Sequence, residues 1–277
     1  MSVLDDIVAG VAEDLEARRR TVPLEQMRQR ARAAAPALDA FAALGGGDAR
    51  EDTLRVIAEV KRSSPSKGAL AEITDPASLA SSYENGGAAV ISVLTEERRF
   101  GGSLADFDAV RAAVDIPLLR KDFTVDEYQI WEARAHGADL VLLIVAALDD
   151  ARLQDFLDLT HELGMNALVE THTAEEIDRA VAVGAKIIGV NVRNLKTLDV
   201  DRSVFASLAS SIPASAVVVA ESGVRDAADV GHYASEGANA VLVGEALVRH
   251  NDPAATIAEF TRTGAQALAA RCVHGKG

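Results

Sequence analysis

The sequence predicts an α/β fold, a (β/α)8 TIM barrel with an N-terminal helical extension, and two features of the chain carry that prediction. Eight short apolar runs recur at intervals of about 20 to 35 residues, the length of one strand with its helix and loops. Most of these runs end on a polar or charged residue, although packing a buried strand gives no reason for charge. Polar side chains at the carboxyl ends of many strands are what a barrel needs to build one site.

Residues 1–50 lie outside the repeat and are expected to form a helical extension that packs on a barrel made of residues 51–277. The segment VLDDIVAGVAEDLEARR has an apolar stripe at helical spacing. The stripe comprises Val3, Ile7, Val8, Val11 and Leu15. A second, alanine-rich segment spans 24–43 and is interrupted by Pro36, and Gly45–Gly47 makes a break. The extension has too little core for an independent domain, so we expect a single domain overall.

Eight parallel strands are expected because the runs are continuously apolar, as in strands buried on both faces. Several runs follow a Gly-Ala-like turn, as in GGAAVISVL (86–94), where glycine is the usual residue just past a helix. The strands are expected to end near Lys61, Thr95, Lys121, Val145, Glu170, Asn191, Glu221 and Gly244. A closed barrel is favoured over an open doubly wound sheet, because the GxGxxG fingerprint of such sheets is absent.

The segments between the strands have helical patterns. Asp75 followed by Pro76 suits a helix cap and a first helical position. The predicted helices span 75–85, 126–136, 149–163, 173–183, 225–235 and 253–270, and VGEAL (243–247) opens a further one. TEERRFGGS (95–103) is a long loop after the second strand and is a candidate flap, with its two arginines expected to face solvent.

Composition excludes several classes of function. The 277 residues are 49% hydrophobic and 25% charged, as in ordinary globular proteins, and the formal net charge is −14. This acidity argues against binding nucleic acid or an anionic membrane surface. No apolar run approaches the ~18–20 residues of a membrane helix, and the first residues are acidic where a signal peptide is basic. Cys272 is the single cysteine, and no zinc-site spacing occurs, so we expect a cytoplasmic protein without a metal.

EVKRSSPSKG (59–68) is the sharpest local signal. Glu59 and Lys61 are two residues apart on a strand, so their side chains point the same way. The serine- and glycine-containing loop after them suits an anion or closure over a ligand. A surface ion pair followed by a polar loop is the alternative, but it leaves a charged pair at the end of LRVIAEV without a reason.

Lys121 ends IPLLRK, and Glu170 ends the fifth strand, nearly opposite the first strand of a closed barrel. A lysine between low-dielectric walls can have its pKa lowered and become a proton donor or a Schiff-base nucleophile. An acid and a base on different strands facing one cavity form the usual acid–base layout. Asp122 could instead pair with Arg120 or Lys121, and Glu170 alone could equally be a solvated rim carboxylate. His172 is expected to be a loop residue.

Asn191 and Arg193 close the sixth strand and also share a face. Asparagine can orient a hydroxyl, and arginine can bind a carboxylate or phosphate in a forked geometry. Gly223 and Gly244 follow strands seven and eight, where barrels of this kind usually bind phosphate through backbone N–H groups. Each glycine alone could simply satisfy a tight turn, but the two together favour a phosphate site.

In order and spacing, these motifs resemble the indole-3-glycerol phosphate synthase family over nearly the whole chain. They are AEVKRSSPSKG, the T-x4-F-G-G-S loop (95–103), LLRKDF, LVETH, GVNVRNL, AESGV and VLVGEAL. The resemblance implies a (β/α)8 barrel with an added N-terminal segment. It also implies conversion of 1-(2-carboxyphenylamino)-1-deoxyribulose 5-phosphate to indole-3-glycerol phosphate, with loss of CO₂ and water and without a metal or organic cofactor.

The resemblance assigns catalytic roles to matching residues. Lys121 matches the general acid that activates the substrate carbonyl, and Glu170 matches the partner in proton transfer during dehydration. Lys61 matches a residue that can share the acid role, and that division stays open. The positions that hold hydroxyls and shape the charge field are matched by Glu59, Asn191 and Glu221.

The resemblance also assigns substrate contacts. Ser64 and Arg193 are candidates for the anthranilate carboxylate. The phosphate region is matched by Lys61, Ser222, Gly223, Gly244 and Glu245, and an apolar wall for the ring by Phe123, Leu142 and Leu195. Some relatives have a small hydroxyl residue where this chain has Glu245. Because a carboxylate repels phosphate, only its backbone N–H is expected to contribute.

The expected partner is a small anionic substrate, which explains lysine and arginine inside an acidic protein. We expect a monomer or weak homo-oligomer with one activity, because no room remains for a second barrel before Gly277. A Schiff-base aldolase using Lys121 is one alternative. Phosphoribosylanthranilate isomerase is another, disfavoured because its chemistry favours a Cys/Asp pair and Cys272 lies outside the strands. A binding or regulatory barrel is disfavoured because every expected polar position is filled.

Overall fold

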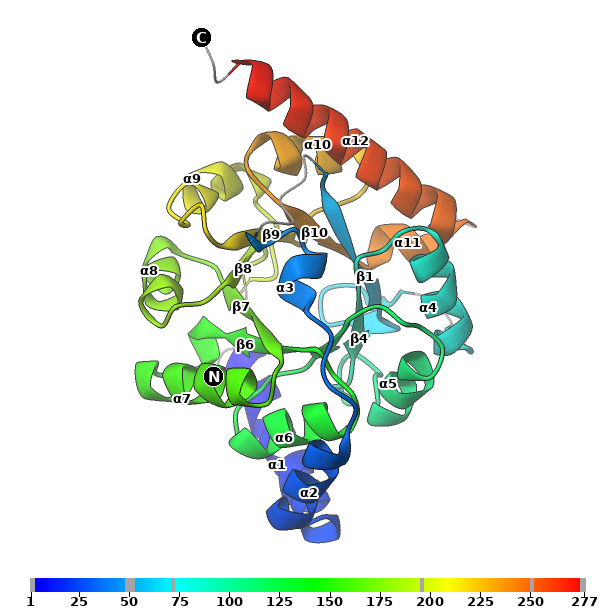
Figure 1. Ribbon diagram of the computed structural model, residues 1–277, viewed down its shortest axis with the longest axis vertical. Helices are drawn as coiled ribbons and strands as arrows, with labels where there is room; N and C mark the ends of the chain where they lie inside the picture. The colour runs from blue at the N-terminus through cyan, green and yellow to red at the C-terminus, as the bar shows by residue number, and fades with distance from the viewer. Residues whose placement is uncertain (1–2, 48–52, 71–72, 195–196, 250–251, 275–277) are drawn as a thin grey trace.

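Eight parallel strands close into a barrel at the centre of the molecule (Figure 1). The computed structural model describes residues 3–47, 53–70, 73–194, 197–249 and 252–274. The barrel strands are β1 (Arg55–Val60), β4 (Val90–Leu94), β5 (Leu118–Lys121), β6 (Leu140–Ile144), β7 (Asn166–Thr171), β8 (Ile187–Asn191), β9 (Val217–Glu221) and β10 (Ala240–Val243). Each strand pairs with the next in chain order, and β1 closes the ring by pairing with both β4 and β10.

The closed barrel and its eight strands are confirmed, and every strand ends within one residue of the position predicted for it. The loop after β1 holds one feature that was not predicted. Its residues form a small antiparallel hairpin of β2 (Ser63–Ser64) and β3 (Gly68–Ala69). Gly68 has a φ of 67°, a backbone conformation that glycine adopts without strain. The hairpin gives this loop a defined shape at the mouth of the barrel.

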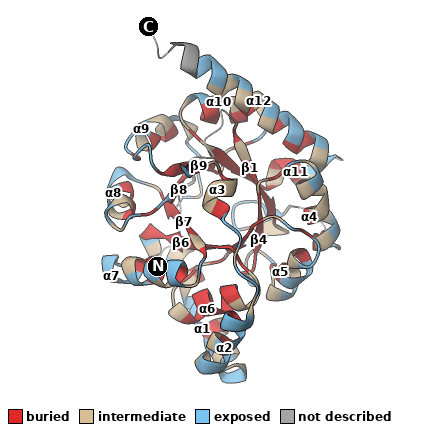
Figure 2. Ribbon diagram, in the orientation of Figure 1, coloured by how far each residue is buried: buried red, intermediate tan, exposed pale blue. Residues whose placement is uncertain are grey.

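Helices surround the barrel and turn their polar faces to solvent (Figure 2). They are α4 (Pro76–Asn85), α5 (Leu104–Arg111), α6 (Glu127–Ala135), α7 (Asp150–Glu162), α8 (Ala174–Ala182), α9 (Phe205–Ala209), α10 (Ala227–Ser235), α11 (Glu245–Arg249) and α12 (Pro253–His274). Asp75 caps α4 as predicted, accepting a hydrogen bond from the N–H of Ser78 at 3.0 Å. The short helices α5 and α9 were not among the predicted segments, because each has too few residues for an apolar stripe to recur. None of the helices in the described residues has the length and apolarity needed to cross a membrane.

Alternation along each strand divides the core into two parts. Val56, Ala58 and Val60 of β1 pack outward against the helices, whereas Ile57 and Glu59 point into the barrel. The interior is apolar at its centre, where Ile57 meets the corresponding residues of the other strands. The next inward position, two residues further along several strands, is polar. The candidate site therefore lies on the same face as the inner core, one layer nearer the carboxyl ends.

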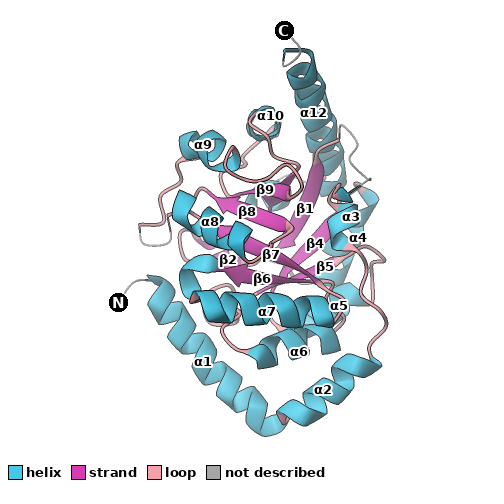
Figure 3. Ribbon diagram, turned by 60° about the vertical axis from the view of Figure 1, so that its left-hand side comes forward, coloured by secondary structure: helices cyan, strands magenta, loops and turns pink. Residues whose placement is uncertain are grey.

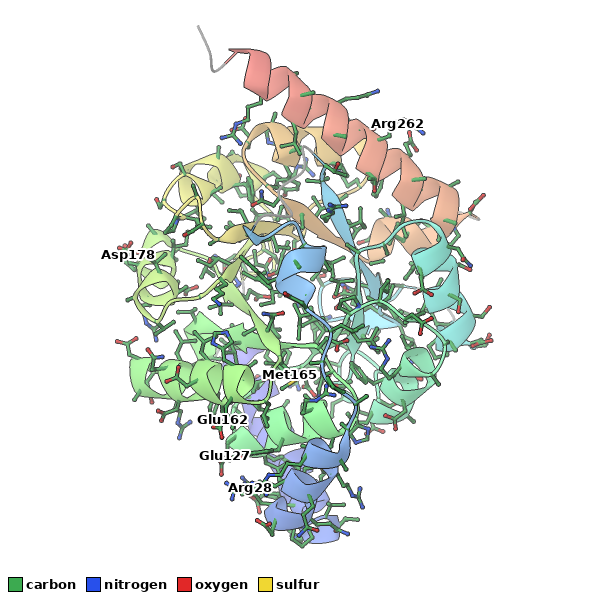
Figure 4. The ribbon with its side chains drawn as sticks, viewed as in Figure 1. Arg28, Glu127, Glu162, Met165, Asp178 and Arg262 are labelled. Atoms are coloured by element: carbon green, nitrogen blue, oxygen red, sulfur yellow. The ribbon has the colours of Figure 1, made fainter. Side chains whose placement is uncertain are left out.

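The N-terminal extension forms two helices and a short third one, α1 (Val3–Thr21), α2 (Leu24–Ala33) and α3 (Ala40–Ala43). Figure 3 shows α1 and α2 wrapping one side of the barrel. The helix α2 packs on α6, and Nη2 of Arg28 lies 3.6 Å from Oε1 of Glu127. Figure 4 labels both side chains, which come from α2 and α6. Met27 and Trp131 belong to the apolar cluster that fills this contact.

The third helix closes the amino-terminal end of the barrel. The backbone N–H groups of Leu38 and Phe41 donate to Asp139, just before β6, and to Asn166, the first residue of β7, at 2.7 and 3.1 Å. Ala40 is fully buried and joins the inner apolar cluster. The extension therefore contacts the amino ends of the strands through α3, whereas α1 reaches their carboxyl ends. The predicted boundary at residue 50 lies outside the described residues.

Candidate active site

Two adjoining cavities open at the carboxyl ends of the strands. The larger cleft has a volume of about 810 Å³ up to its open mouth, and the second cavity, beside β9 and β10, has about 530 Å³. Both are lined by Glu59, Lys61, Lys121, Asn191, Arg193 and Ser222. The larger cleft also contains Ser64, Phe123, Leu142 and Glu170, and the second cavity contains Glu221, Gly223, Gly244 and Glu245. The structure thus brings together every predicted site residue except Leu195, which lies outside the described residues.

Lys121 lies among three buried carboxylates contributed by different strands. Its Nζ is 3.4 Å from Oε2 of Glu170 and 3.7 Å from Oε2 of Glu221. Burial alone would lower the pKa of Lys121, but the carboxylates that face it, Glu170 above all, more than offset burial and raise that pKa above its ordinary value. Lys121 is therefore protonated at neutral pH.

This result corrects the expectation of a lowered lysine pKa. That expectation considered the low-dielectric walls around Lys121 and omitted the carboxylates that face it from β7 and β9. A Schiff-base nucleophile must be a neutral amine, whereas a general acid must hold a proton. The raised pKa of Lys121 therefore favours the acid role and disfavours the aldolase alternative.

Glu170 and Glu221 are pushed toward opposite protonation states. For Glu170, burial raises the pKa, but the nearby charges of Lys121 and His172 lower it overall. For Glu221, burial and the charge of Glu170 raise the pKa well above its usual range, despite Lys121. Two carboxylates this close cannot both be ionised cheaply, so Glu170 is the anion and Glu221 holds a proton.

Glycines leave the space that two of these carboxylates occupy. A Cβ added to Gly189 of β8 would lie 2.0 Å from Oε1 of Glu221, and one added to Gly244 would lie 2.9 Å from Oε1 of Glu59. Real Cβ atoms essentially never approach another atom so closely. The absence of a side chain at these two positions therefore belongs to the construction of the site.

Glu59 and Lys61 point the same way, as predicted, and form an ion pair. Glu59 is almost completely buried, whereas the Lys61 side chain keeps about a fifth of its surface exposed, 21%. Lys61 therefore lies at the mouth of the cavities, and the buried carboxylate of Glu59 partly balances its charge.

Asn191 and Ser222 are joined at the ends of β8 and β9. The Ser222 hydroxyl donates to Oδ1 of Asn191 at 2.9 Å, and the backbone N–H of Arg193 donates to the same oxygen at 3.1 Å. Ser222 has a φ of 69°, a strained conformation for a residue with a side chain, and Gly223 follows with a φ of 78°. This turn directs the Ser222 hydroxyl into the cleft and brings the backbone of Gly223 to its edge.

The carboxylate of Glu245 is engaged by cations. Lys67, just before β3, has its Nζ 2.5 Å from Oε1 of Glu245, and Arg249 pairs with the same oxygen. The negative charge at this position is therefore balanced. The neighbouring pocket is rich in cations, with Arg193, Arg202 and Arg225 along its wall.

Phe123 and Leu142 form part of an apolar wall, as predicted, and sequence reasoning missed several of its members. The missed residues are Val3, Leu4 and Ile7 of α1, with Leu94, Phe100 and Ile144 of the barrel. The stripe on α1 predicted that the helix would pack on the barrel but not that it would line the site. Arg98 is exposed, as expected, but its guanidinium pairs with Glu13 and Asp14 of α1.

His172 and Asp122 make contacts beside the site. His172 is a loop residue between β7 and α8, as expected, and its Nε2 lies 3.3 Å from Oε1 of Glu170. Its position directly after LVET was the signal that could have identified it. Asp122 pairs with Arg120 at 3.1 Å and accepts a hydrogen bond from Thr95 at 2.6 Å, behind the strand rather than with Lys121. In the described part of the chain, no group of three or more His, Cys, Asp or Glu side chains is arranged to hold a metal.

A (β/α)8 barrel with a protonated lysine beside an ionised glutamate at its carboxyl ends defines an acid–base enzyme of the TIM-barrel class. The fold is similar to 3-hexulose-6-phosphate synthase from Salmonella typhimurium, with a TM-score of 0.61 at 16% identity, covering 79% of this chain and 100% of that chain. The family model for indole-3-glycerol phosphate synthase matches residues 4–260, and the chain belongs to that family.

Similar curated relatives carry the family's name. The chain is 73% identical to the indole-3-glycerol phosphate synthase of Arthrobacter sp. (strain FB24), over 98% of this chain and 100% of the relative. It is 60% identical to indole-3-glycerol phosphate synthase 1 of Streptomyces coelicolor, over 95% of this chain and 96% of the relative. The match therefore includes the N-terminal extension as well as the barrel.

Proposed function

We propose that this protein closes the indole ring of 1-(2-carboxyphenylamino)-1-deoxyribulose 5-phosphate by acid–base catalysis, the reaction of the family to which it belongs. One observation carries the assignment of roles. A lysine held in its protonated form lies 3.4 Å from an ionised glutamate, beside an apolar cleft. Lys121 is the proton donor, and Glu170 is its partner in proton transfer.

Ring closure begins when Lys121 donates its proton toward the carbonyl oxygen of the substrate's ribulose portion. The carbonyl carbon then accepts the electron pair of the aromatic carbon that bears the carboxylate, and a new C–C bond forms. Phe123 and Leu142 hold the ring in the apolar cleft, with Ile7 of α1 covering it. Because the cleft holds the two reacting carbons in contact, much of the entropic cost of bringing them together is met when the substrate binds.

Loss of CO₂ follows without a cofactor because ring attack leaves a cationic iminium. The bond to the carboxylate breaks, and its electron pair neutralises the iminium. Dehydration then removes the hydroxyl made from the carbonyl, together with a proton from the neighbouring carbon. Glu170 is ionised and can accept that proton. Lys61 can donate a proton to the departing hydroxyl, and Lys121 is the other source once it has regained a proton from solvent.

The anionic ends of the substrate bind at opposite sides of the joined cavities. Ser64 and Arg193 bind the carboxylate. The phosphate binds where the second cavity meets Lys61, Ser222, Gly223, Gly244 and Glu245. Because Lys67 and Arg249 balance the Glu245 carboxylate, only the backbone N–H of Glu245 is assigned to the phosphate.

The remaining polar groups hold the sugar, and the extension completes the site. Glu59, Asn191 and Glu221 are placed to hold the substrate hydroxyls. The extension of residues 1–50 and the barrel of residues 51–277 act as one unit, because α1 contributes part of the cleft wall.

The experiment follows the indole product by its fluorescence with the wild type and the Lys121→Ala variant. General acid catalysis contributes about 10²- to 10⁴-fold, so kcat is expected to fall by that factor in the variant. Lys186→Ala is the matched control, because Lys186 is exposed at the opposite end of the barrel, before β8. Turnover that survives in Lys121→Ala but collapses in Lys61→Ala would move the acid role to Lys61. Tight binding without any wild-type turnover would refute the catalytic proposal.

A further inference from the structure

The carboxylate of Glu170 lies between two cations, one on each oxygen. Its Oε2 faces Nζ of Lys121 at 3.4 Å, and its Oε1 faces Nε2 of His172 at 3.3 Å. Only 3% of the Glu170 side chain is exposed, so water contributes little to its solvation. Lys121 lines the cleft, whereas His172 is not among the residues that line it. The imidazole therefore supports Glu170 from behind, on the side away from the substrate.

Glu176 fixes the orientation of this imidazole. Oε2 of Glu176 accepts a hydrogen bond from the backbone N–H of His172 at 2.7 Å and lies 3.1 Å from its Nδ1. Glu176 is held in turn by the first turn of α8, where its N–H donates to the side chain of the capping residue Thr173 at 3.2 Å. With Nδ1 held at Glu176, Nε2 lies within ion-pair distance of Glu170, at 3.3 Å, without the geometry of a hydrogen bond. The first turn of α8 thus sets the orientation of the His172 ring beside Glu170.

The groups facing His172 keep it charged. Glu170 of β7 and Glu176 of α8 are in direct contact, and Glu221 of β9 and Lys121 of β5 lie beyond Glu170. Burial alone would lower the pKa of His172, but the hydrogen bonds and charges of Glu170 and Glu176 raise it to about 10. The imidazole therefore carries both protons at neutral pH, with Nδ1 at Glu176 and Nε2 within ion-pair distance of Glu170.

We infer that His172 is a positioning residue for Glu170: its imidazolium, oriented by Glu176, holds the carboxylate in place and ionised from the side opposite Lys121. This inference rests on the role proposed above for Glu170. It differs from that role because His172 does not touch the substrate. Its importance follows from the first proton transfer. When Lys121 gives up its proton, the charge that balanced Oε2 disappears, and His172 remains as the counterion of Glu170.

A purely structural role for the same contacts would be to cap α8. The two roles differ in what they do to proton transfer. Loss of a cap lowers stability and leaves the pKa of Glu170 unchanged. Loss of the imidazolium raises the pKa of Glu170, because one of its two cations is gone. The pH dependence of kcat therefore separates the two roles.

The first test replaces His172 with a neutral side chain that retains an N–H donor, in His172→Gln. We expect kcat to fall by about 10- to 100-fold, the usual cost of removing a group that orients a catalytic residue. The acidic limb of the kcat profile is expected to move to higher pH, because Glu170 then takes up a proton more readily. KM is expected to stay within about threefold of the wild type, because His172 makes no contact with the substrate.

The second test weakens the charge on His172 without removing the ring, in Glu176→Gln. The pKa of His172 should fall from about 10 toward its ordinary value of 6.5. A basic limb in kcat should consequently appear between these two pH values, where the wild type has none from this group. Below that limb, the variant should turn over at nearly the wild-type rate, because the imidazole is still charged there.

Two matched controls separate this effect from folding. Asp149→Ala removes the cap of the neighbouring helix α7, where Asp149 accepts a hydrogen bond from the N–H of Arg152 at 2.8 Å, so it should lower stability without moving either limb. His136→Gln removes a histidine that pairs with Asp108 at 2.6 Å on the outer helices, and it should leave the profile unchanged. If His172→Gln lowers kcat by the same factor at every pH, the role of His172 is structural and the inference is wrong.

A measurement independent of turnover distinguishes failure of this inference from failure of the proposed function. The imidazole C–H resonances of His172, assigned by comparison with His172→Gln, report its pKa by NMR titration. The inference requires titration far above 6.5 in the wild type, with a lower value in Glu170→Gln. Titration near 6.5 would overturn it even if the enzyme is fully active. A high value in a protein that does not turn over the substrate would support the contact and reject the function.

Discussion

Gly189 offers a direct test of how the site is built, because it lies where a methyl group would strike Glu221. The Cβ of an alanine at this position would be 2.0 Å from Oε1 of Glu221 and 3.2 Å from Cδ1 of Leu168. Ordinary contacts begin at 3.4 Å, so the carboxylate or the strand must move by the difference, about 1.4 Å. Glu221 can yield only within the cluster that also contains Lys121, 3.7 Å away.

The expected cost follows from that displacement. A misplacement of about 1 Å in a catalytic group can cost about 100-fold in rate. Gly189→Ala is therefore expected to lower kcat/KM by about 100-fold, because moving Glu221 displaces the amine of Lys121, which lies 3.7 Å from it. Overpacking of a buried strand should also lower the free energy of unfolding by about 1–3 kcal/mol. The loss of activity should be evident at temperatures where the variant is fully folded.

The assay is the steady-state rate of indole product formation, followed by fluorescence, with folding checked by circular dichroism. Gly231→Ala is the matched control, because its Cβ would meet only Cγ2 of Thr263, at 3.3 Å, on the outer helices. A double-mutant cycle with Glu221→Ala tests the cause. If the clash with Glu221 is responsible, Gly189→Ala should cost little once the carboxylate is absent. Wild-type activity in Gly189→Ala, or full additivity in the cycle, would refute this account.

Two further predictions concern stability. Asp122→Ala should lower the free energy of unfolding by about 3 kcal/mol in urea, because it leaves the buried guanidinium of Arg120 with one of its two carboxylate partners; a loss below about 1 kcal/mol would contradict this. Because the pKa of His172 is raised to about 10, its contribution to stability is complete below pH 6.5 and is lost as the pH rises through 10. Urea unfolding should therefore show the advantage of the wild type over His172→Gln shrinking across that interval, and an advantage that stays constant would count against the shift.

The barrel and the location of the site could be predicted because both follow from properties of single strands. In a parallel barrel, the carboxyl ends of all strands lie at the same rim. A polar residue at the end of an apolar run is therefore placed at that rim. Glu59 and Lys61 illustrate this, because their spacing alone predicted that they would share a cavity. The same reasoning placed Lys121 and Glu170 there without any knowledge of their distance.

Properties that depend on several strands at once could not be predicted in the same way. A lowered pKa was considered for Lys121 because burial is visible in the sequence, whereas the approach of Glu170 from another strand is not. The role of Ile7 was missed for a related reason. A helical stripe shows that α1 buries one face, but only the three-dimensional path of the chain shows that this face covers the cleft.

The charge of the whole chain also fails to predict the charge of its site. The formal net charge is −14, yet the proposed substrate is an anion. Inside the cleft, protonation of Glu221 removes one negative charge, and the carboxylates of Glu59 and Glu170 face Lys61, Lys121 or His172. Toward the proposed phosphate end, the pocket wall carries more cations than anions. Since screening limits the reach of surface charge to about 8–10 Å, acidity elsewhere on the protein does not cancel this local excess.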